Sequence, residues 1–170
     1  DTDRAHVEIE FPLFLARPAP VSGIVGMMEY SCGFVISHDD SADVLMCVKL
    51  EVSTVCPCSK EISVAGAHNQ RAWLRLRGQF VDGASMTFEE MIAAGETLGS
   101  CEIYPLVKRA DEKYVTERGY FNPKFVEDVV RDAVVWLRGD ARVRWFRAEC
   151  EADESIHLHN AYAAQEEGEA

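Results

Sequence analysis

The sequence predicts an α+β fold, because stretches with strand-like alternation surround two stretches with helical features. His6 to Phe11 alternates apolar and polar residues, as a half-buried strand does. Phe125 to Leu137 instead repeats apolar residues at helical spacing, with charged residues between them. From Val44 onward the expected order is strand, strand, helix, helix, strand, strand.

The N-terminal part is expected to be a pair of strands, 6–11 and 24–36, separated by prolines and a Ser-Gly turn. These strands have no helix of their own. We therefore divide the chain into the closing strands of a first module whose start is absent (1–42), a second module (43–164) and an acidic tail (165–170), which we expect to be frayed.

Within the second module, two strands are expected at 44–53 and 72–80. Thr87 and Glu90 have the spacing of a capping box, so a short helix should begin there and end at Gly95. A longer helix is expected to start with Asn122 as its cap and Pro123 in its first turn, and to end at Gly139. The closing strands are expected at 142–152 and 157–162.

Composition limits the classes of partner. The chain has 170 residues, and its 29 acidic and 17 basic side chains give a formal net charge of −12. Because non-specific nucleic-acid binding needs a basic surface, we expect no such partner. No apolar run approaches the roughly 20 residues that span a bilayer, and the N-terminus does not resemble a signal peptide. Six cysteines without a secretory signal favour reduced thiols and a cytoplasmic location.

A metal site is one interpretation of Cys56-Pro57-Cys58-Ser59-Lys60, which follows a strand, and of His68 twelve residues after Cys56. A thiolate at a strand end and an imidazole beyond a short loop can converge on zinc or a related ion. The alternative is that both cysteines are small buried apolar residues and that His68 is an ordinary surface or core histidine.

Two glutamates are candidates for binding roles. Glu102 lies among apolar neighbours, where a carboxylate must be paired, hydrogen-bonded or bound to a metal. Glu117 could accept hydrogen bonds from two donors, such as the N1–H and exocyclic amine of guanine. For each residue, the alternative is an ordinary surface acid.

Glu154, His157 and His159 form a further candidate group. On a strand, histidines two residues apart would face the same side, where they could bind metal or move protons near neutral pH. The alternative is a loop with two exposed histidines. Four cations adjacent to these motifs could hold a triphosphate or could be solvated surface residues. They are Lys60, Arg71, Lys108 and Arg109.

Taken together, these segments resemble the type IB GTP cyclohydrolase family along almost the whole chain. The most specific matches are Thr-Val-Cys-Pro-Cys-Ser-Lys from Thr54 and Gly-Ala-His-Asn-Gln-Arg from Gly66. Further matches are Phe-Pro-Leu-Phe from Phe11, Ala-Pro-Val-Ser-Gly from Ala19, Ser-Cys-Glu-Ile-Tyr-Pro from Ser100, Lys-Arg-Ala-Asp-Glu-Lys-Tyr-Val-Thr-Glu from Lys108, Asn-Pro-Lys-Phe-Val-Glu-Asp from Asn122 and Glu-Ser-Ile-His-Leu-His from Glu154.

The resemblance implies two tunnelling-fold modules per chain, each with an antiparallel sheet and helices on one face. The modules are expected to form barrels in a homo-oligomer, specifically a tetramer. It implies GTP as the substrate, formate and dihydroneopterin triphosphate as the products, and folate synthesis as the pathway. An N-terminal stretch of the family, Lys-Gly-Thr-His-Met-Ser-Arg, is not found in this sequence.

The resemblance also implies roles for individual residues. Cys56, His68 and Glu102 would bind a divalent metal, with manganese or zinc expected. Glu117 would anchor guanine. Glu154, His157 and His159 would serve catalysis, and one of the two histidines could reach the metal. Cys58 would lie near the site with a supporting or redox role.

Two other functions are compatible with parts of this pattern. One is another pterin or deazapurine enzyme of the same fold, such as a nitrile reductase with a nucleophilic cysteine and a nicotinamide cofactor. The other is a non-catalytic metal-binding or assembly module. Turnover of GTP with release of formate distinguishes the three.

Overall fold

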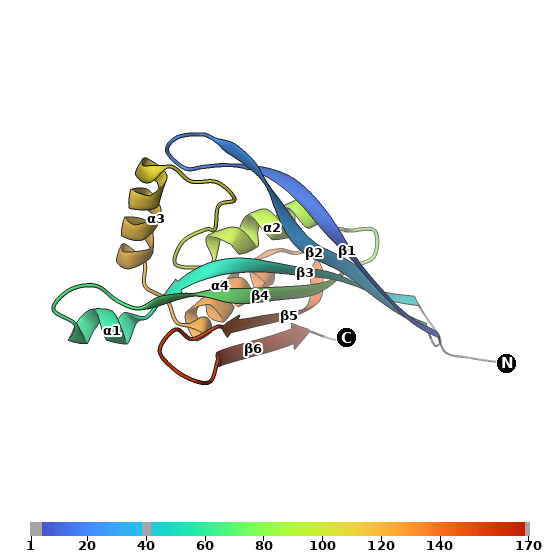
Figure 1. Ribbon diagram of the computed structural model, residues 1–170. Coiled ribbons are helices and arrows are strands. Elements are labelled where there is room, and N and C mark those ends of the chain that lie inside the picture. Colours follow the sequence, from blue (N-terminus) through green and yellow to red (C-terminus); the bar gives the residue numbers. More distant parts are fainter. Residues whose placement is uncertain (1–4, 39–41, 169–170) are drawn as a thin grey trace.

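The computed structural model describes residues 5–38 and 42–168, and it confirms the mixed α+β class. Six strands form one antiparallel sheet in the order β1-β2-β3-β4-β5-β6, so each strand pairs with its neighbours in the chain (Figure 1). The strands are β1 Ala5–Pro18, β2 Val25–His38, β3 Ala42–Val55, β4 Asn69–Phe80, β5 Val143–Ala152 and β6 Ala161–Gly168. The helices are α1 Pro57–Ile62, α2 Phe88–Thr97, α3 Arg109–Phe121 and α4 Val126–Gly139.

The core lies between one face of the sheet and helices α2 and α4. Apolar residues of α4 recur at helical spacing on its buried side, and they share one core with the alternate inward residues of β3, β4 and β5. The buried α4 residues are Val126, Val129, Val130, Ala133, Val134 and Leu137. α2 contributes Met91 and Ile92 to the same core.

The β1–β2 hairpin is longer than the sequence predicts, and its first strand includes two prolines. Pro12 pairs with Ser31 and Pro18 ends β1. Because β1 is an outer strand of the sheet, a missing N–H there can be tolerated on its outward side. Gly33 on β2 permits the close pairing, since an added Cβ would lie 2.3 Å from the carbonyl oxygen of Ile9.

The hairpin is joined to the helical layer by a part-buried ion pair. Nε of Arg17 on β1 lies 2.9 Å from Oε1 of Glu96 on α2. The hydroxyl of Tyr30 on β2 donates to the same carboxylate oxygen. Burial and the neighbouring Glu96 carboxylate raise the pKa of Tyr30, so its hydroxyl remains the donor.

Several predicted boundaries are wrong. Helix α3 was not expected, and Asn122 ends α3 instead of capping α4, which has Phe125 as its N-cap. The reason is that α3 has few apolar residues, and its buried positions are Asp111 and Gly119. The final strand is β6, not 157–162, and it extends through Gln165–Gly168, where a frayed tail was expected.

The capping box at Thr87 and Glu90 is confirmed. The Glu90 amide donates to Oγ1 of Thr87 at 3.1 Å, and the Thr87 amide donates to Oε2 of Glu90 at 2.7 Å. The helix that it opens continues through Thr97, two residues beyond the glycine expected to close it. None of the helices in the described ranges is long and apolar enough to cross a membrane.

Candidate functional site

Cys56 lies at the junction between β3 and the short helix α1. Its Sγ accepts a hydrogen bond from the amide of Ser59 at 3.4 Å, and Pro57 occupies the first turn of the helix. The Cys56 amide donates to the carbonyl of His68 at 3.1 Å. The Ser59 hydroxyl donates to the Cys56 carbonyl and accepts from the His68 amide, at 3.1 and 3.2 Å. These backbone contacts bring Cys56 and His68 together, as their positions in the sequence predict.

The predicted catalytic group shares a cavity with this pair. A pocket of about 240 Å³ is lined by Cys56, His68, Glu154, His157 and His159, with residues from α4 completing the wall. The imidazole rings of His157 and His159 stack at a centroid distance of 5.2 Å. Both histidines lie in the exposed loop between β5 and β6, which is the alternative that the sequence left open, and the strand expected to begin at His157 is wrong there.

Glu102 is not brought into the same cavity. It lines a neighbouring pocket of about 400 Å³ with Tyr104, Arg71 and Glu112. Its carboxylate accepts a hydrogen bond from the Cys101 thiol, and burial together with that carboxylate raises the pKa of Cys101 to about 11. Among residues 5–38 and 42–168, no three Cys, His, Asp or Glu side chains are grouped closely enough to hold a metal ion.

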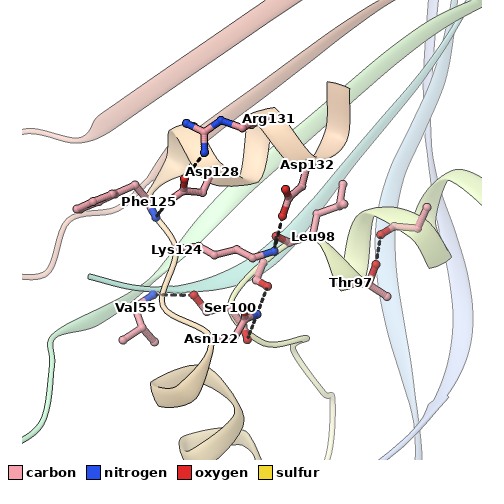
Figure 2. Close-up of polar contacts among 12 residues, drawn as sticks. Val55, Thr97, Leu98, Ser100, Asn122, Lys124, Phe125, Asp128, Arg131 and Asp132 are labelled. Carbon is pink, nitrogen blue, oxygen red and sulfur yellow. Dashed lines mark hydrogen bonds and ion pairs between the residues drawn. The ribbon is translucent and has the colours of Figure 1, made fainter. Parts of the chain in front are cut away.

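The segment that precedes Glu102 is tied to the end of β3 and to the α3–α4 connection. The buried Ser100 hydroxyl accepts from the Val55 amide at 3.1 Å. Figure 2 shows Asn122 directed toward Ser100 and Lys124 directed toward Leu98. Asn122 donates to the Ser100 carbonyl at 3.0 Å, and Lys124 donates to the Leu98 carbonyl at 2.8 Å. Polar side chains thus fix the relative position of the segments that carry Cys56 and Glu102.

Glu117 lies on the exposed side of α3. Its nearest ionic partner is Lys113, with 3.8 Å between Nζ and Oε1, and its side chain is 56% exposed. Neither pocket is lined by Glu117; the α3 residues that line the larger pocket are Glu112, Val115 and Thr116. Within one chain, the predicted guanine anchor is therefore separate from the predicted catalytic group.

The position of α3 depends on Asp111, which is fully buried. Its carboxylate accepts from the amides of Val21, Ser22 and Lys108 at 2.8 to 2.9 Å, and from the Ser22 hydroxyl at 2.6 Å. Burial alone would raise the pKa of Asp111, but the hydrogen bonds from Ser22, Lys108 and Val21 hold it well below its ordinary value. The β1–β2 turn is thereby fastened to the start of α3.

The four predicted phosphate-binding cations do not line one common pocket in the described chain. Lys60 donates to the Tyr120 carbonyl at 2.6 Å and lies 4.5 Å from the centre of the Tyr120 ring. Arg71 lines the larger pocket and lies 3.1 Å from Glu51. Lys108 and Arg109 are exposed at the beginning of α3. Arg71 is therefore the candidate cation that lines a described pocket.

Sequence reasoning gave no role to Gln70, Thr54 or Ser155, which contact the histidine site. Gln70 lines both pockets, and its side chain bonds to His68, Thr54 and Glu154. The signal was present in the sequence, because Gln70 belongs to the same short motif as His68 and follows it by two residues on β4. Tyr104 and Glu112 of the larger pocket were also not assigned roles.

The fold and the pocket define an α+β chain with a cysteine–histidine site next to a second cavity. Comparison with known sequences identifies the group. The chain belongs to the family described as type I GTP cyclohydrolase FolE2, whose profile matches residues 1–163.

Curated relatives agree with this family. The GTP cyclohydrolase FolE2 of Pelobacter propionicus is 47% identical over 162 residues, which cover 95% of this chain and 62% of that protein. The enzyme of the same name from Geobacter sulfurreducens is 47% identical, covering 96% and 62%. That from Desulfosudis oleivorans is 48% identical, covering 96% and 63%. The chain thus spans about three fifths of the length of these relatives.

Proposed function

We propose that this chain forms part of a GTP cyclohydrolase of the type IB kind, which hydrolyses GTP at C8 to formate and 7,8-dihydroneopterin triphosphate in folate biosynthesis. The observation that carries the proposal is the pocket shared by Cys56, His68, Glu154, His157 and His159, in a chain whose relatives are named GTP cyclohydrolase FolE2. The pocket combines possible metal ligands with groups that can transfer protons.

The donor chemistry of Cys56 and His68 suits a divalent ion, because thiolate and imidazole are the ligands that zinc prefers and that related ions accept. Their backbones are hydrogen-bonded and their side chains line one cavity, which supports them as two ligands. Glu102 is proposed as the third on the family resemblance, and it must move from the neighbouring pocket to serve. Manganese or zinc would lower the pKa of a bound water, making hydroxide available near neutral pH.

The roles of the remaining pocket residues follow from their chemistry. Water must add to C8 of guanine, the adduct must open to a formamide, and a second hydrolysis must release formate. Each step moves a proton to or from a ring nitrogen or an oxygen. Imidazoles are common proton-transfer groups, so His157 and His159 are proposed for this role, and Glu154 lines the same cavity. Cys58 is proposed as a supporting residue beside Cys56.

The larger pocket is proposed to hold other parts of the substrate. Arg71 lines it and is suited to a phosphate group. Glu117 is proposed to accept from two donors of guanine, although it is exposed on α3 in the single chain. Lys60 and Lys108 are proposed as further triphosphate contacts; Lys60 would first have to leave the Tyr120 carbonyl.

We also propose a homo-oligomer, specifically a tetramer, whose tunnelling-fold modules close into barrels. β1 and β6 are the outer strands of the sheet in the described chain, and long outer strands offer free N–H and C=O groups for pairing. An exposed Glu117 would then be available to a site formed between subunits. We place the enzyme in the cytoplasm, where GTP is supplied and thiols such as Cys56 stay reduced.

The decisive experiment measures formate release from GTP by the full-length protein. We expect turnover that is lost after chelation and restored by manganese or zinc. Reduction of a nitrile by a nicotinamide cofactor without metal would identify the alternative enzyme of the same fold. Metal binding without turnover of either substrate would indicate an assembly module. Light scattering on the same sample tests the tetramer, and a monomer at micromolar concentration would contradict it.

A further inference from the structure

The side chain of Gln70 lies among four polar groups around the histidine site. Its Oε1 is 3.0 Å from Nδ1 of His68, and its Nε2 is 3.1 Å from Oγ1 of Thr54 and 3.4 Å from Oε1 of Glu154. The hydroxyl of Ser155 lies 3.4 Å from both Oε1 of Gln70 and Nδ1 of His68. Gln70 is therefore held at both ends of its amide.

The hydrogen-bonding capacity of these groups fixes the orientation of the amide. An ionised carboxylate can only accept, so the NH₂ end of Gln70 must face Glu154. The Thr54 hydroxyl donates to the main-chain carbonyl oxygen of Gln70 at 3.5 Å, which leaves the hydroxyl oxygen to accept from the side-chain NH₂ group of Gln70. The Oε1 end of the Gln70 side-chain amide consequently faces His68.

The orientation of Gln70 in turn determines which nitrogen of His68 carries the proton. Oε1 of Gln70 can only accept, so Nδ1 of His68 must donate to it. The Ser155 hydroxyl can donate its own proton to Oε1 without conflict. A neutral imidazole with its proton on Nδ1 has a free lone pair on Nε2. In the described part of the chain, no hydrogen bond involves Nε2 of His68.

We infer that Gln70 is a positioning residue: it holds neutral His68 as the Nδ1–H tautomer and thereby presents Nε2 as the nitrogen that binds an electrophile or a proton. The use of that nitrogen for a divalent metal rests on the proposed function, whereas the tautomer does not. Thr54 and Glu154 act on His68 only through the amide of Gln70. Partners of this type orient the ring of a metal-binding histidine and set its tautomer.

The tautomer is tested by solid-state ¹⁵N NMR on metal-free, full-length protein with ring-labelled histidine, at about pH 8, where an ordinary imidazole is neutral. His68 is assigned by its loss in His68→Gln. We expect a protonated Nδ1 and an unprotonated Nε2. In Gln70→Leu the two tautomers should mix, whereas Gln70→Glu keeps an acceptor oxygen and should retain Nδ1–H. Gln165→Leu, at an exposed glutamine on β6, is the matched control.

A second measurement uses zinc alone, in competition with a chromophoric chelator. Gln70→Leu should weaken zinc binding about 10- to 100-fold, and Gln165→Leu should bind as wild type does. A proton on Nε2 in wild-type protein would overturn the inference even if Gln70→Leu does not fold. Unchanged His68 spectra or unchanged zinc affinity in folded Gln70→Leu would also overturn it. If the wild-type protein binds no metal, but its Nδ1–H tautomer of His68 is lost in the Gln70→Leu variant, the proposed function fails and the positioning role stands.

Discussion

Replacing Ser100 by alanine removes a single oxygen from the joint between the segments that carry Cys56 and Glu102. The Ser100 side chain is fully buried, and its hydroxyl accepts from the Val55 amide at 3.1 Å. Alanine leaves that buried N–H without an acceptor, which costs about 1–3 kcal/mol in the free energy of unfolding. For a chain of this size, each kcal/mol lowers Tm by about 2–4 °C, so we expect a decrease of about 2–12 °C.

The assay is urea unfolding at a fixed protein concentration, with Tm as a second measurement. The midpoint should fall while the m value stays constant, because the mutation does not change the surface exposed on unfolding. Ser31→Ala is the matched control, since its hydroxyl bonds to Glu10 in an exposed position and its loss should change stability by less than about 0.5 kcal/mol. Equal effects of the two substitutions would refute the role assigned to the Ser100 bond.

Three further predictions concern the acid stability and the chemistry of the site. The folded-state pKa of Asp111 is depressed, so its stabilising contribution should be complete above the ordinary aspartate pKa of about 3.9 and should decrease as pH falls below it. The free energy of unfolding of Asp111→Asn, measured across that pH range, should depend on pH less than that of wild type. Cys56→Ala should lose most bound metal and nearly all formate release, whereas Cys58→Ala should lose less of both. Elemental analysis measures the metal and GTP turnover measures the activity. The reverse order would mean that the wrong cysteine is assigned. Glu117→Gln should impair GTP binding by about 2–4 kcal/mol with metal content unchanged, and wild-type KM and kcat in that variant would reject the guanine assignment.

The parts of the fold that were predictable are those with a strong pattern of apolar residues. Strand alternation in β3 and β4 and the apolar stripe of α4 follow from burial against one core, so the sequence reveals them. α3 has no such stripe. It is held by the buried carboxylate of Asp111, whose partners at Val21 and Ser22 are about 90 residues away in the sequence. No local pattern contains that information.

In the candidate site too, some features were predictable from a local sequence pattern and others were not. Cys56 and His68 meet because a strand end and the start of the next strand are neighbours in an antiparallel pair, which the sequence order predicts. The pairing of His157 with His159 was expected from strand geometry, but they are brought together in a loop, where ring stacking takes the place of strand alternation. The exposure of Glu117 depends on the rotation of α3, which its polar sequence does not fix.

Glu102 and Cys56 line two different cavities, and both cavities contact the side chain of Gln70. Gln70 contributes to the walls of both, so the pocket of Cys56 and His68 and the pocket of Glu102 and Arg71 share one β4 side chain. A ligand in the larger pocket would lie beside Gln70, whose side-chain amide is hydrogen-bonded to Thr54 and Glu154. A ligand that displaces the Gln70 amide should therefore also change the hydrogen bond between Oε1 of Gln70 and Nδ1 of His68.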